Sequence, residues 1–300
     1  MESGMELQVE HLCKSYRKKE ALKEVNFKLE QGVYGLLGEN GAGKSTLMRI
    51  LTTVDFPTGG RVLYNGKNIK QMDEDYRDLV GYMPQDYSVY PGFTATDFLN
   101  YMGTLKGIPA DKLKAKIPEV LEFVNLSDVA NKKVRTFSGG MKRRIGIAQA
   151  ILNNPEILIL DEPTAGLDPK ERIRFSNIIS NMAKEKIILL STHIVSDIEA
   201  IANRLIIIHK GEIMKTGNID TMVEDVAGKV WEVIVTQDRM NEINKERAVI
   251  HIKQAGKEVQ VRFVGEALSD FSCKSVIPTL EDYYIYVSMT LCQRKQKGVK

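Results

Sequence analysis

Short apolar runs separated by polar, glycine-containing segments mark the first two thirds of the chain. Residues 157–160, 187–190 and 205–208 are continuous apolar runs bounded by polar residues. Strands that are buried on both faces, as in a parallel sheet covered by helices, have this pattern. Residues 33–37 form a similar run that ends at a glycine-rich turn, and an apolar helical segment, residues 46–51, follows. The order strand, loop, helix predicts an α/β fold.

Helical periodicity appears between these strands. Apolar residues recur at the spacing of one helix face within residues 94–126, and Thr96 is the predicted N-cap. The recurring residues are Phe98, Met102 and Leu105. We predict a helical subdomain at about residues 90–152.

Hairpin signals indicate that the fold also contains antiparallel strands. Residues 62–64 precede Asn65-Gly66, a dipeptide that favours tight hairpin turns, so we predict an antiparallel β portion near the N-terminus. Residues 79–83 predict one more strand before Pro84. Lys210-Gly211 can turn the run at residues 205–208 back on itself.

The pattern changes after residue 220. Three short β patterns alternate with charged residues, and a helical pattern follows at residues 279–289. The β patterns lie at residues 231–236, 249–252 and 259–264. We therefore predict a first domain over residues 5–220 and a small α+β accessory domain over residues 221–300.

Composition narrows the class of protein. Of the 300 residues, 43% are hydrophobic and 27% are charged, which is typical of a globular protein. A formal net charge of +3 is too small to indicate nucleic-acid binding. Cys13, Cys273 and Cys292 show no metal-ligand spacing and suit a reducing compartment. With no long apolar span and no secretory leader, the chain is expected in the cytosol, where only a partner would link it to a membrane.

A complete phosphate-binding motif follows the strand at residues 33–37. Its pattern, G-x-x-x-x-G-K-[ST], is filled by Gly38, Glu39, Asn40, Gly41, Ala42, Gly43, Lys44 and Ser45. Glycines let successive N–H groups converge on phosphate oxygens, and the helix that follows from Thr46 directs its positive end at the anion. We predict that Lys44 contacts the β- and γ-phosphates of ATP and that Ser45 is a ligand of Mg²⁺. A structural turn is the alternative for such a stretch on its own.

Two adjacent carboxylates, Asp161 and Glu162, end the apolar run at residues 157–160. In P-loop ATPases a carboxylate at such a strand end holds Mg²⁺, and Asp161 fits that role. Glu162 could reach the attacking water as general base. Two acids after a strand usually form a solvated turn, and only the upstream P-loop favours the catalytic interpretation.

Further residues resemble the motifs of ATP-binding cassette (ABC) proteins, in that family's order over about residues 5–220. Residues 137–144 resemble the signature motif, in which Ser138, Gly139 and Gly140 are retained while Phe137 and Met141 replace the usual leucine and glutamine. Four single positions match other motifs of the family: Gln85 the Q-loop, Asp168 the D-loop, His193 the switch histidine and Tyr16 the aromatic that stacks on adenine. Each of these residues taken alone could be structural.

The resemblance implies an α/β P-loop fold of ABC type that acts as a head-to-tail dimer with two ATP sandwiched at its interface. In it, Tyr16, Gln85, Ser138, Gly139, Gly140 and Asp168 contact nucleotide, Ser45, Gln85 and Asp161 hold Mg²⁺, and Glu162 and His193 are catalytic. Ser138 is also the predicted cap of a helix that starts at Gly139. The two replacements put the rate of hydrolysis in question.

We expect ATP hydrolysis by this chain to power a membrane transporter, with the chain at the cytoplasmic face of the cell membrane. The resemblance implies a separate integral membrane permease and a second ATPase subunit, identical or different, with no nucleic acid. We expect Tyr87, Val89, Tyr90 and Phe93 to help form the groove for the permease. Residues 278–284 resemble the end of bacterial exporter ATPases of the multidrug, lantibiotic and sodium-extrusion type, although an amphipathic helix closing a small domain explains them equally well.

Two other functions compete with the transporter. A soluble ABC ATPase acting in translation or DNA maintenance usually carries two cassettes or a long coiled-coil insertion, and this sequence has one P-loop and no long heptad tract. A P-loop kinase would have no use for the signature motif.

Overall fold

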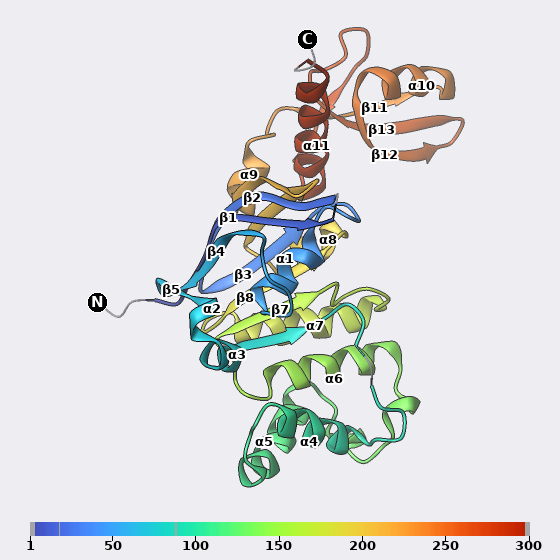
Figure 1. Ribbon diagram of the computed structural model, residues 1–300. Helices are drawn as coiled ribbons and strands as arrows, with labels where there is room; N and C mark the ends of the chain where they lie inside the picture. The colour runs from blue at the N-terminus through green and yellow to red at the C-terminus, as the bar shows by residue number, and fades with distance from the viewer. Residues whose placement is uncertain (1–3, 18, 88, 298–300) are drawn as a thin grey trace. The chain divides into compact units, whose positions relative to one another are not determined.

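The computed structural model describes residues 4–17, 19–87 and 89–297, and the chain forms two compact units, Met1–Thr216 and Gly217–Lys300 (Figure 1). Residue 220, near which the sequence pattern changes, lies inside a helix of the second unit, α9 (Ile219–Glu224).

A six-stranded sheet forms the centre of the first unit, in the order β10-β9-β3-β8-β7-β6. Its strands are β3 (Gly32–Leu37), β6 (Val80–Met83), β7 (Ile157–Asp161), β8 (Ile187–Thr192), β9 (Arg204–His209) and β10 (Glu212–Asn218). From β9 to β6, every neighbouring pair is parallel, as the apolar runs predicted. Lys210 and Gly211 both have positive φ (48° and 84°) in the turn between β9 and β10.

An antiparallel sheet, in the order β2-β1-β4-β5, completes the β structure of this unit. Its strands are β1 (Glu6–Tyr16), β2 (Lys19–Glu30), β4 (Gly59–Tyr64) and β5 (Lys67–Asn68). The predicted hairpin is confirmed, because Tyr64 pairs with Lys67 across the Asn65-Gly66 turn. One hydrophobic core joins both sheets with α1 (Lys44–Leu51), and it includes Leu12, Leu36, Met48 and Ile159. Two short helices, α2 (Ile69–Met72) and α3 (Glu74–Leu79), lead from β5 to β6.

Three helices form the helical portion of the first unit (Figure 1). They are α4 (Ala95–Leu105), α5 (Ala110–Phe123) and α6 (Gly139–Ile151), with short 3₁₀ turns at Ser127–Val129 and Val134–Thr136. The N-cap predicted at Thr96 is wrong. Thr94 caps α4, because its hydroxyl accepts from Asp97 N (3.1 Å) while the Asp97 carboxylate accepts from Thr94 N (3.0 Å), a reciprocal pair that Thr96 lacks.

The buried face of α4 differs in part from the predicted one. Phe98 and Leu99 are buried, whereas Leu105, expected on the same face, is 65% exposed. Leu105 is the last residue of α4, beyond the turns that pack against α5 and α6.

Two further helices follow strands of the six-stranded sheet. They are α7 (Pro169–Met182), after β7, and the five-residue α8 (Val195–Glu199), after β8. No helix in the described part of the chain has the length and apolar character that crossing a membrane requires.

The second unit has its own sheet and core. The sheet, β12-β13-β11-β14, contains β11 (Val230–Val235), β12 (Ala248–Ala255), β13 (Glu258–Val264) and β14 (Lys274–Ser275). Three of these strands and α11 (Leu280–Lys297) follow the predicted pattern, whereas β14 and α10 (Gln237–Glu246) were not predicted. Residues of α10, Met240 and Ile243, pack with Val233, Val261 and Phe263 in the core.

Candidate functional site

The phosphate-binding motif forms a loop between β3 and α1, and its glycines are needed for backbone reasons. Gly41 and Gly43 have positive φ (80° and 111°), a conformation that L side chains rarely adopt. Gly38 has no room for a side chain, because a Cβ there would come within 2.3 Å of the Ile208 carbonyl oxygen. The loop therefore reaches the first turn of α1 with its backbone curled, as anion binding requires.

Lys44 is a nearly buried cation at the centre of the loop. Its Nζ donates to the carbonyl oxygens of Gly38 (2.7 Å) and Glu39 (3.4 Å) and lies 3.7 Å from Glu162 Oε1. Burial lowers the pKa of the Lys44 ammonium, against the raising effect of Glu162 and Asp161. The site thus places a positive charge where the phosphates of a nucleotide are expected.

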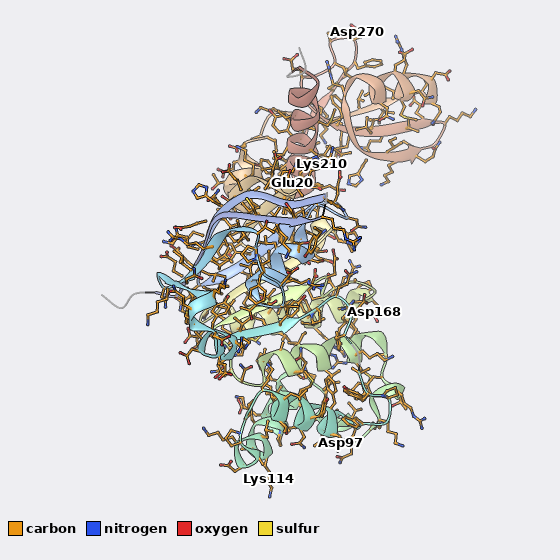
Figure 2. All side chains as sticks on the ribbon, in the orientation of Figure 1. Glu20, Asp97, Lys114, Asp168, Lys210 and Asp270 are labelled. Atoms are coloured by element: carbon orange, nitrogen blue, oxygen red, sulfur yellow. The ribbon has the colours of Figure 1, made fainter. Side chains whose placement is uncertain are left out.

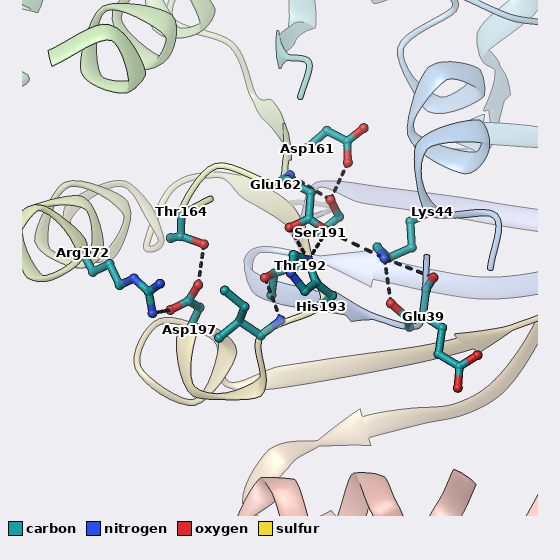
Figure 3. A network of polar contacts seen from close by, with 12 residues as sticks. Glu39, Lys44, Asp161, Glu162, Thr164, Arg172, Ser191, Thr192, His193 and Asp197 are labelled. Carbon is teal, nitrogen blue, oxygen red and sulfur yellow. Dashed lines mark hydrogen bonds and ion pairs between the residues drawn. The ribbon is translucent and has the colours of Figure 1, made fainter. Parts of the chain in front are cut away.

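Of the two predicted carboxylates, Asp161 is the last residue of β7 and Glu162 follows it. A serine of β8 contacts both residues (Figure 3). Ser191 Oγ donates to Asp161 Oδ1 (2.5 Å) and accepts from Glu162 N (3.0 Å). Glu162 has φ +48°, the left-handed conformation that is uncommon for a residue with a side chain. Its carboxylate lies 3.0 Å from His193 Nδ1. Asp161, Ser191, Glu162 and His193 therefore form one connected group of two carboxylates, a hydroxyl and an imidazole.

A second polar network lies beside this group. Asp197 of α8 accepts from the Thr164 hydroxyl (2.5 Å) and from Arg172 Nη1 of α7 (3.0 Å), and its side chain is 4% exposed (Figure 3). It connects the loop after Glu162 with the helix after His193.

A cleft of about 510 Å³ gathers most of the predicted residues. It is lined by Tyr16, Lys19, Ala21, Glu39, Asn40, Gly41, Gly43, Lys44, Ser45, Thr46, Gln85, Glu162, Ala165 and His193. Asp161, 2% exposed, lies next to Glu162 beneath the surface, and Gly38 and Ala42 are buried within the loop. Lys19 and Ala21 were not predicted, because nothing in the sequence marks them.

The remaining predicted residues lie elsewhere. Ser138, Gly139 and Gly140 begin α6, where Ser138 Oγ accepts from Met141 N (3.2 Å), so the predicted cap is confirmed. Asp168 caps α7, and its carboxylate accepts from Glu171 N (2.9 Å; labelled in Figure 2). A separate hollow of about 420 Å³ contains Gly139 together with Gln85 and Ala165, which line both cavities.

Gln85 is tied to α6 by its neighbours. Arg143 Nη1 donates to the Gln85 carbonyl oxygen (3.0 Å), and the Tyr87 hydroxyl donates to the Lys142 carbonyl oxygen. Burial raises the pKa of Tyr87 to about 12, so this phenol stays protonated and able to donate. The loop that follows β6 therefore connects the cleft with the helix that carries the signature residues.

Comparison with known proteins identifies the family of this chain. The sequence model of the ABC transporter family matches residues 22–165. The uncharacterized ABC transporter ATP-binding protein YxlF of Bacillus subtilis (strain 168) is 39% identical over 232 residues, 77% of each chain. The chain belongs to the ABC transporter family. It is an ATP-binding subunit of that family and an ATPase.

Other ABC relatives have more specific names. The linearmycin resistance ATP-binding protein LnrL of the same Bacillus subtilis strain is 34% identical, over 74% of this chain and 72% of its own. A Nod factor export ATP-binding protein I of Burkholderia thailandensis is 36% identical, over 72% of this chain and 71% of its own.

Solved structures show the same ABC fold. An ATP-binding subunit of an ABC transporter superposes with a TM-score of 0.65 at 29% identity, covering 73% of this chain and 92% of its own. A dimeric, post-hydrolysis ATP-binding cassette bound to ADP and Pi has a TM-score of 0.64 at 25% identity, with 71% and 98% coverage.

Proposed function

We propose that two copies of an ABC cassette, either both this chain or this chain and a related one, hydrolyse Mg-ATP between them and so power export by a separate membrane permease. The division of the site supports the dimer. The cleft holds Tyr16, Lys44 and Glu162, while the signature turn at Ser138–Gly140 and the Asp168 cap are placed outside it. A head-to-tail partner would bring its own signature turn to this cleft.

Hard oxygen donors in the cleft and directly beneath its surface fit a magnesium ion. Ser45, Gln85 and Asp161 offer a hydroxyl, an amide carbonyl and a carboxylate, which are the donor types that Mg²⁺ prefers, and Ser191 holds Asp161 in place. When bound, the ion neutralises phosphate charge as the terminal phosphate leaves. Lys44 adds a fixed positive charge on the loop side.

Glu162 is positioned to take a proton from the attacking water. Its carboxylate is 7% exposed, and Lys44 and His193 lie on either side of it at 3.7 and 3.0 Å. We assign Glu162 as general base and His193 as the residue that orients it and the terminal phosphate. Because Ser191 fixes the backbone N–H of Glu162, its carboxylate reaches the cleft from a defined position.

Substitution of Glu162 by glutamine tests this assignment. The variant keeps the size of the side chain, so we expect ATP affinity within about threefold and hydrolysis lowered by about 10²-fold or more, the usual scale for loss of a general base. Phosphate release at saturating ATP and equilibrium binding measure the two quantities. Hydrolysis at the rate of the unaltered chain would remove Glu162 from the mechanism.

The permease is expected to bind beside α4. Tyr90 and Phe93 contact Tyr101 edge to face at ring-centroid distances of 5.1 and 5.8 Å, and Tyr90 remains 45% exposed. An exposed aromatic cluster of this kind suits a protein partner at the cytoplasmic face of the membrane. Val89 and Tyr87 line the neighbouring hollow, although the hydroxyl of Tyr87 is engaged with α6.

Charge placed in the aromatic cluster tests permease binding. We expect Tyr90→Glu to uncouple transport from ATP hydrolysis while basal hydrolysis stays within about twofold, because the cluster lies outside the cleft. Phe123→Glu is the control, because Phe123 is also an exposed aromatic (37%) and lies on α5, outside the cluster. Unchanged coupling in the Tyr90 variant contradicts this placement.

A pull-down of the tagged Glu162→Gln chain from native membranes, with ATP present, identifies the partner that ATP hydrolysis drives. Recovery of a multi-span membrane protein supports the transporter, and reconstitution of that pair in vesicles then gives the direction of transport. The names of the two relatives, resistance to linearmycin and export of Nod factor, favour export. Recovery of ribosomes or nucleic acid without a permease would favour a soluble ABC ATPase instead.

A further inference from the structure

Tyr16 is held from behind by two residues that lie outside the nucleotide motifs. It ends β1, and its hydroxyl donates to Asp55 Oδ2 in the loop after α1. Asp55 Oδ1 accepts from Lys14 Nζ (2.6 Å), and the same ammonium donates to the Phe56 carbonyl oxygen (2.6 Å). The ammonium also lies 4.8 Å from the centroid of the Tyr16 ring. One cation and one carboxylate thus fix both the hydroxyl and the ring.

Burial separates the roles of these residues. The side chains of Lys14 and Asp55 are 11% and 17% exposed, whereas Tyr16 is 43% exposed and lines the cleft. Lys14 and Asp55 therefore restrain the ring from the protein side, and the cleft side of the ring is left for a ligand.

The Asp55 carboxylate is ionised under physiological conditions. Burial raises the pKa of Asp55, but hydrogen bonds from Lys14, Tyr16 and the backbone N–H of Phe56 bring it down to about 2. The carboxylate therefore stays ionised and accepts from Tyr16 throughout the neutral range. A ring held in one orientation loses less conformational entropy when a flat ligand stacks on it.

We propose that Asp55 and Lys14 are positioning residues that orient Tyr16 for the nucleobase and so set the share of nucleotide affinity that comes from the base. The proposal depends on the proposed stacking of Tyr16 on adenine. It assigns to Asp55 and Lys14 an effect on the base alone, because both lie behind Tyr16 and the phosphates are held by the loop at Gly38–Ser45.

Calorimetry on the full chain with two probes separates base from phosphate. Mg-ADP carries the base and the phosphates, and Mg-pyrophosphate carries the phosphates alone. For Asp55→Asn we expect the Kd for ADP to rise about 5- to 10-fold, the scale of the net contribution of one hydrogen bond, with the Kd for pyrophosphate within about twofold. Tyr16→Phe removes the same hydrogen bond and should match it.

Two further variants complete the series. The double variant Tyr16→Phe/Asp55→Asn should bind ADP no more weakly than either single variant, because the two substitutions remove the same hydrogen bond. Lys14→Met should raise the Kd for ADP in the same direction. Asp73→Asn is the control: it removes a carboxylate from an exposed ion pair with Arg77 and should change neither Kd.

The outcomes distinguish the two levels of the proposal. If Tyr16→Ala weakens ADP binding while Asp55→Asn and Tyr16→Phe do not, the positioning role is wrong and the stacking stands. If Tyr16→Ala itself leaves ADP affinity unchanged, the stacking fails as well. An equal loss for ADP and pyrophosphate in Asp55→Asn means general disturbance of the cleft and overturns the positioning role. Tyr16→Phe remains informative if the Asp55 variant does not fold.

Discussion

Ser191 serves both carboxylates of the site with a single hydroxyl. It is fully buried, and its Oγ donates to Asp161 while accepting from the backbone N–H of Glu162. Substitution by alanine leaves both of these groups without their partner in a buried place, which costs about 1–3 kcal/mol each in mutational data. Because Glu162 also loses its backbone anchor, we expect ATP hydrolysis to fall about tenfold or more, with a smaller change in ATP affinity.

Thermal unfolding and phosphate release measure these two effects of Ser191→Ala. Ser176→Ala is the control, because its hydroxyl donates only to the Arg172 carbonyl oxygen within α7. Normal hydrolysis by a destabilised Ser191→Ala variant would limit Ser191 to a structural role.

The sequence pointed to the continuous motifs directly and to Tyr16, Gln85 and His193 through the family resemblance, and all of these have residues in the cleft, but it gave no sign of the residues that support them. Gly38–Ser45 and the Asp161-Glu162 pair carry a local pattern, since neighbouring residues act on one ligand. Ser191 and Asp55 act across 30 and 39 residues of chain, on Asp161 and Tyr16 respectively. No local periodicity encodes such a contact, so only the fold reveals it.

Gly146 adapts α6 to the loop after β6. A Cβ at this position would lie 2.5 Å from the Tyr87 ring, whereas a Cβ at Gly139, in the same helix, would meet nothing closer than 4.0 Å. Alanine normally stabilises a helix relative to glycine by about 0.5–1 kcal/mol. For Gly146→Ala we instead expect a loss of about 1–3 kcal/mol, the usual cost of overpacking.

Unfolding in urea measures the effect of Gly146→Ala, and Gly139→Ala serves as its control for stability alone. The double variant Gly146→Ala/Tyr87→Ala should recover part of the loss, because it removes the ring that the new methyl group meets. A Gly146→Ala chain as stable as the unaltered one contradicts the tight fit between α6 and Tyr87.

Elements with a strong apolar pattern were the easiest to predict. The buried strands β3, β7, β8 and β9 appeared as continuous apolar runs, because a parallel sheet covered on both faces needs them. The two-residue β14 and the mostly polar α10 have no such period and were missed. The start of α4 was predicted two residues too late, at Thr96, because the reciprocal hydrogen bonds between Thr94 and Asp97 determine the cap and a threonine alone does not.

Each unit of the molecule has the core that an independent fold requires. The residues that line the cleft all fall between Tyr16 and His193, within the first unit, and the second unit packs its own sheet against α10. We therefore expect a chain ended at Asn218, the last residue of β10, to bind Mg-ADP with a Kd within about twofold of the full chain. Loss of binding by a folded truncated chain would show that the nucleotide site needs the accessory region.

An ion pair between Arg262 and the buried Asp282 stabilises the second unit. Arg262 contacts both carboxylate oxygens of Asp282 (2.9 and 2.6 Å), which is fully buried and also accepts from Thr279 N at the start of α11. Burial raises the pKa of Asp282, but its bonds to Arg262 and Thr279 outweigh this and lower it below 3.8. The stabilisation is therefore complete above that value and is lost as the pH falls through the lower, folded-state pKa.

Asp282→Asn leaves the Arg262 side chain, which is 15% exposed, with Glu232 at 3.2 Å as its one charged partner among the described residues. We expect about 3 kcal/mol of destabilisation at pH 7, the low end for breaking a buried pair, and a gap from the unaltered chain that narrows below about pH 3.8. Trp231, the only tryptophan of the chain, lies in β11 and donates to the Gly265 carbonyl oxygen (3.1 Å), so its fluorescence follows the second unit alone. If the two units fold independently, Asp282→Asn lowers the midpoint of the unfolding transition that tryptophan fluorescence follows, and it leaves the Kd for ADP constant. A matching loss of ADP affinity would show that the two units unfold together.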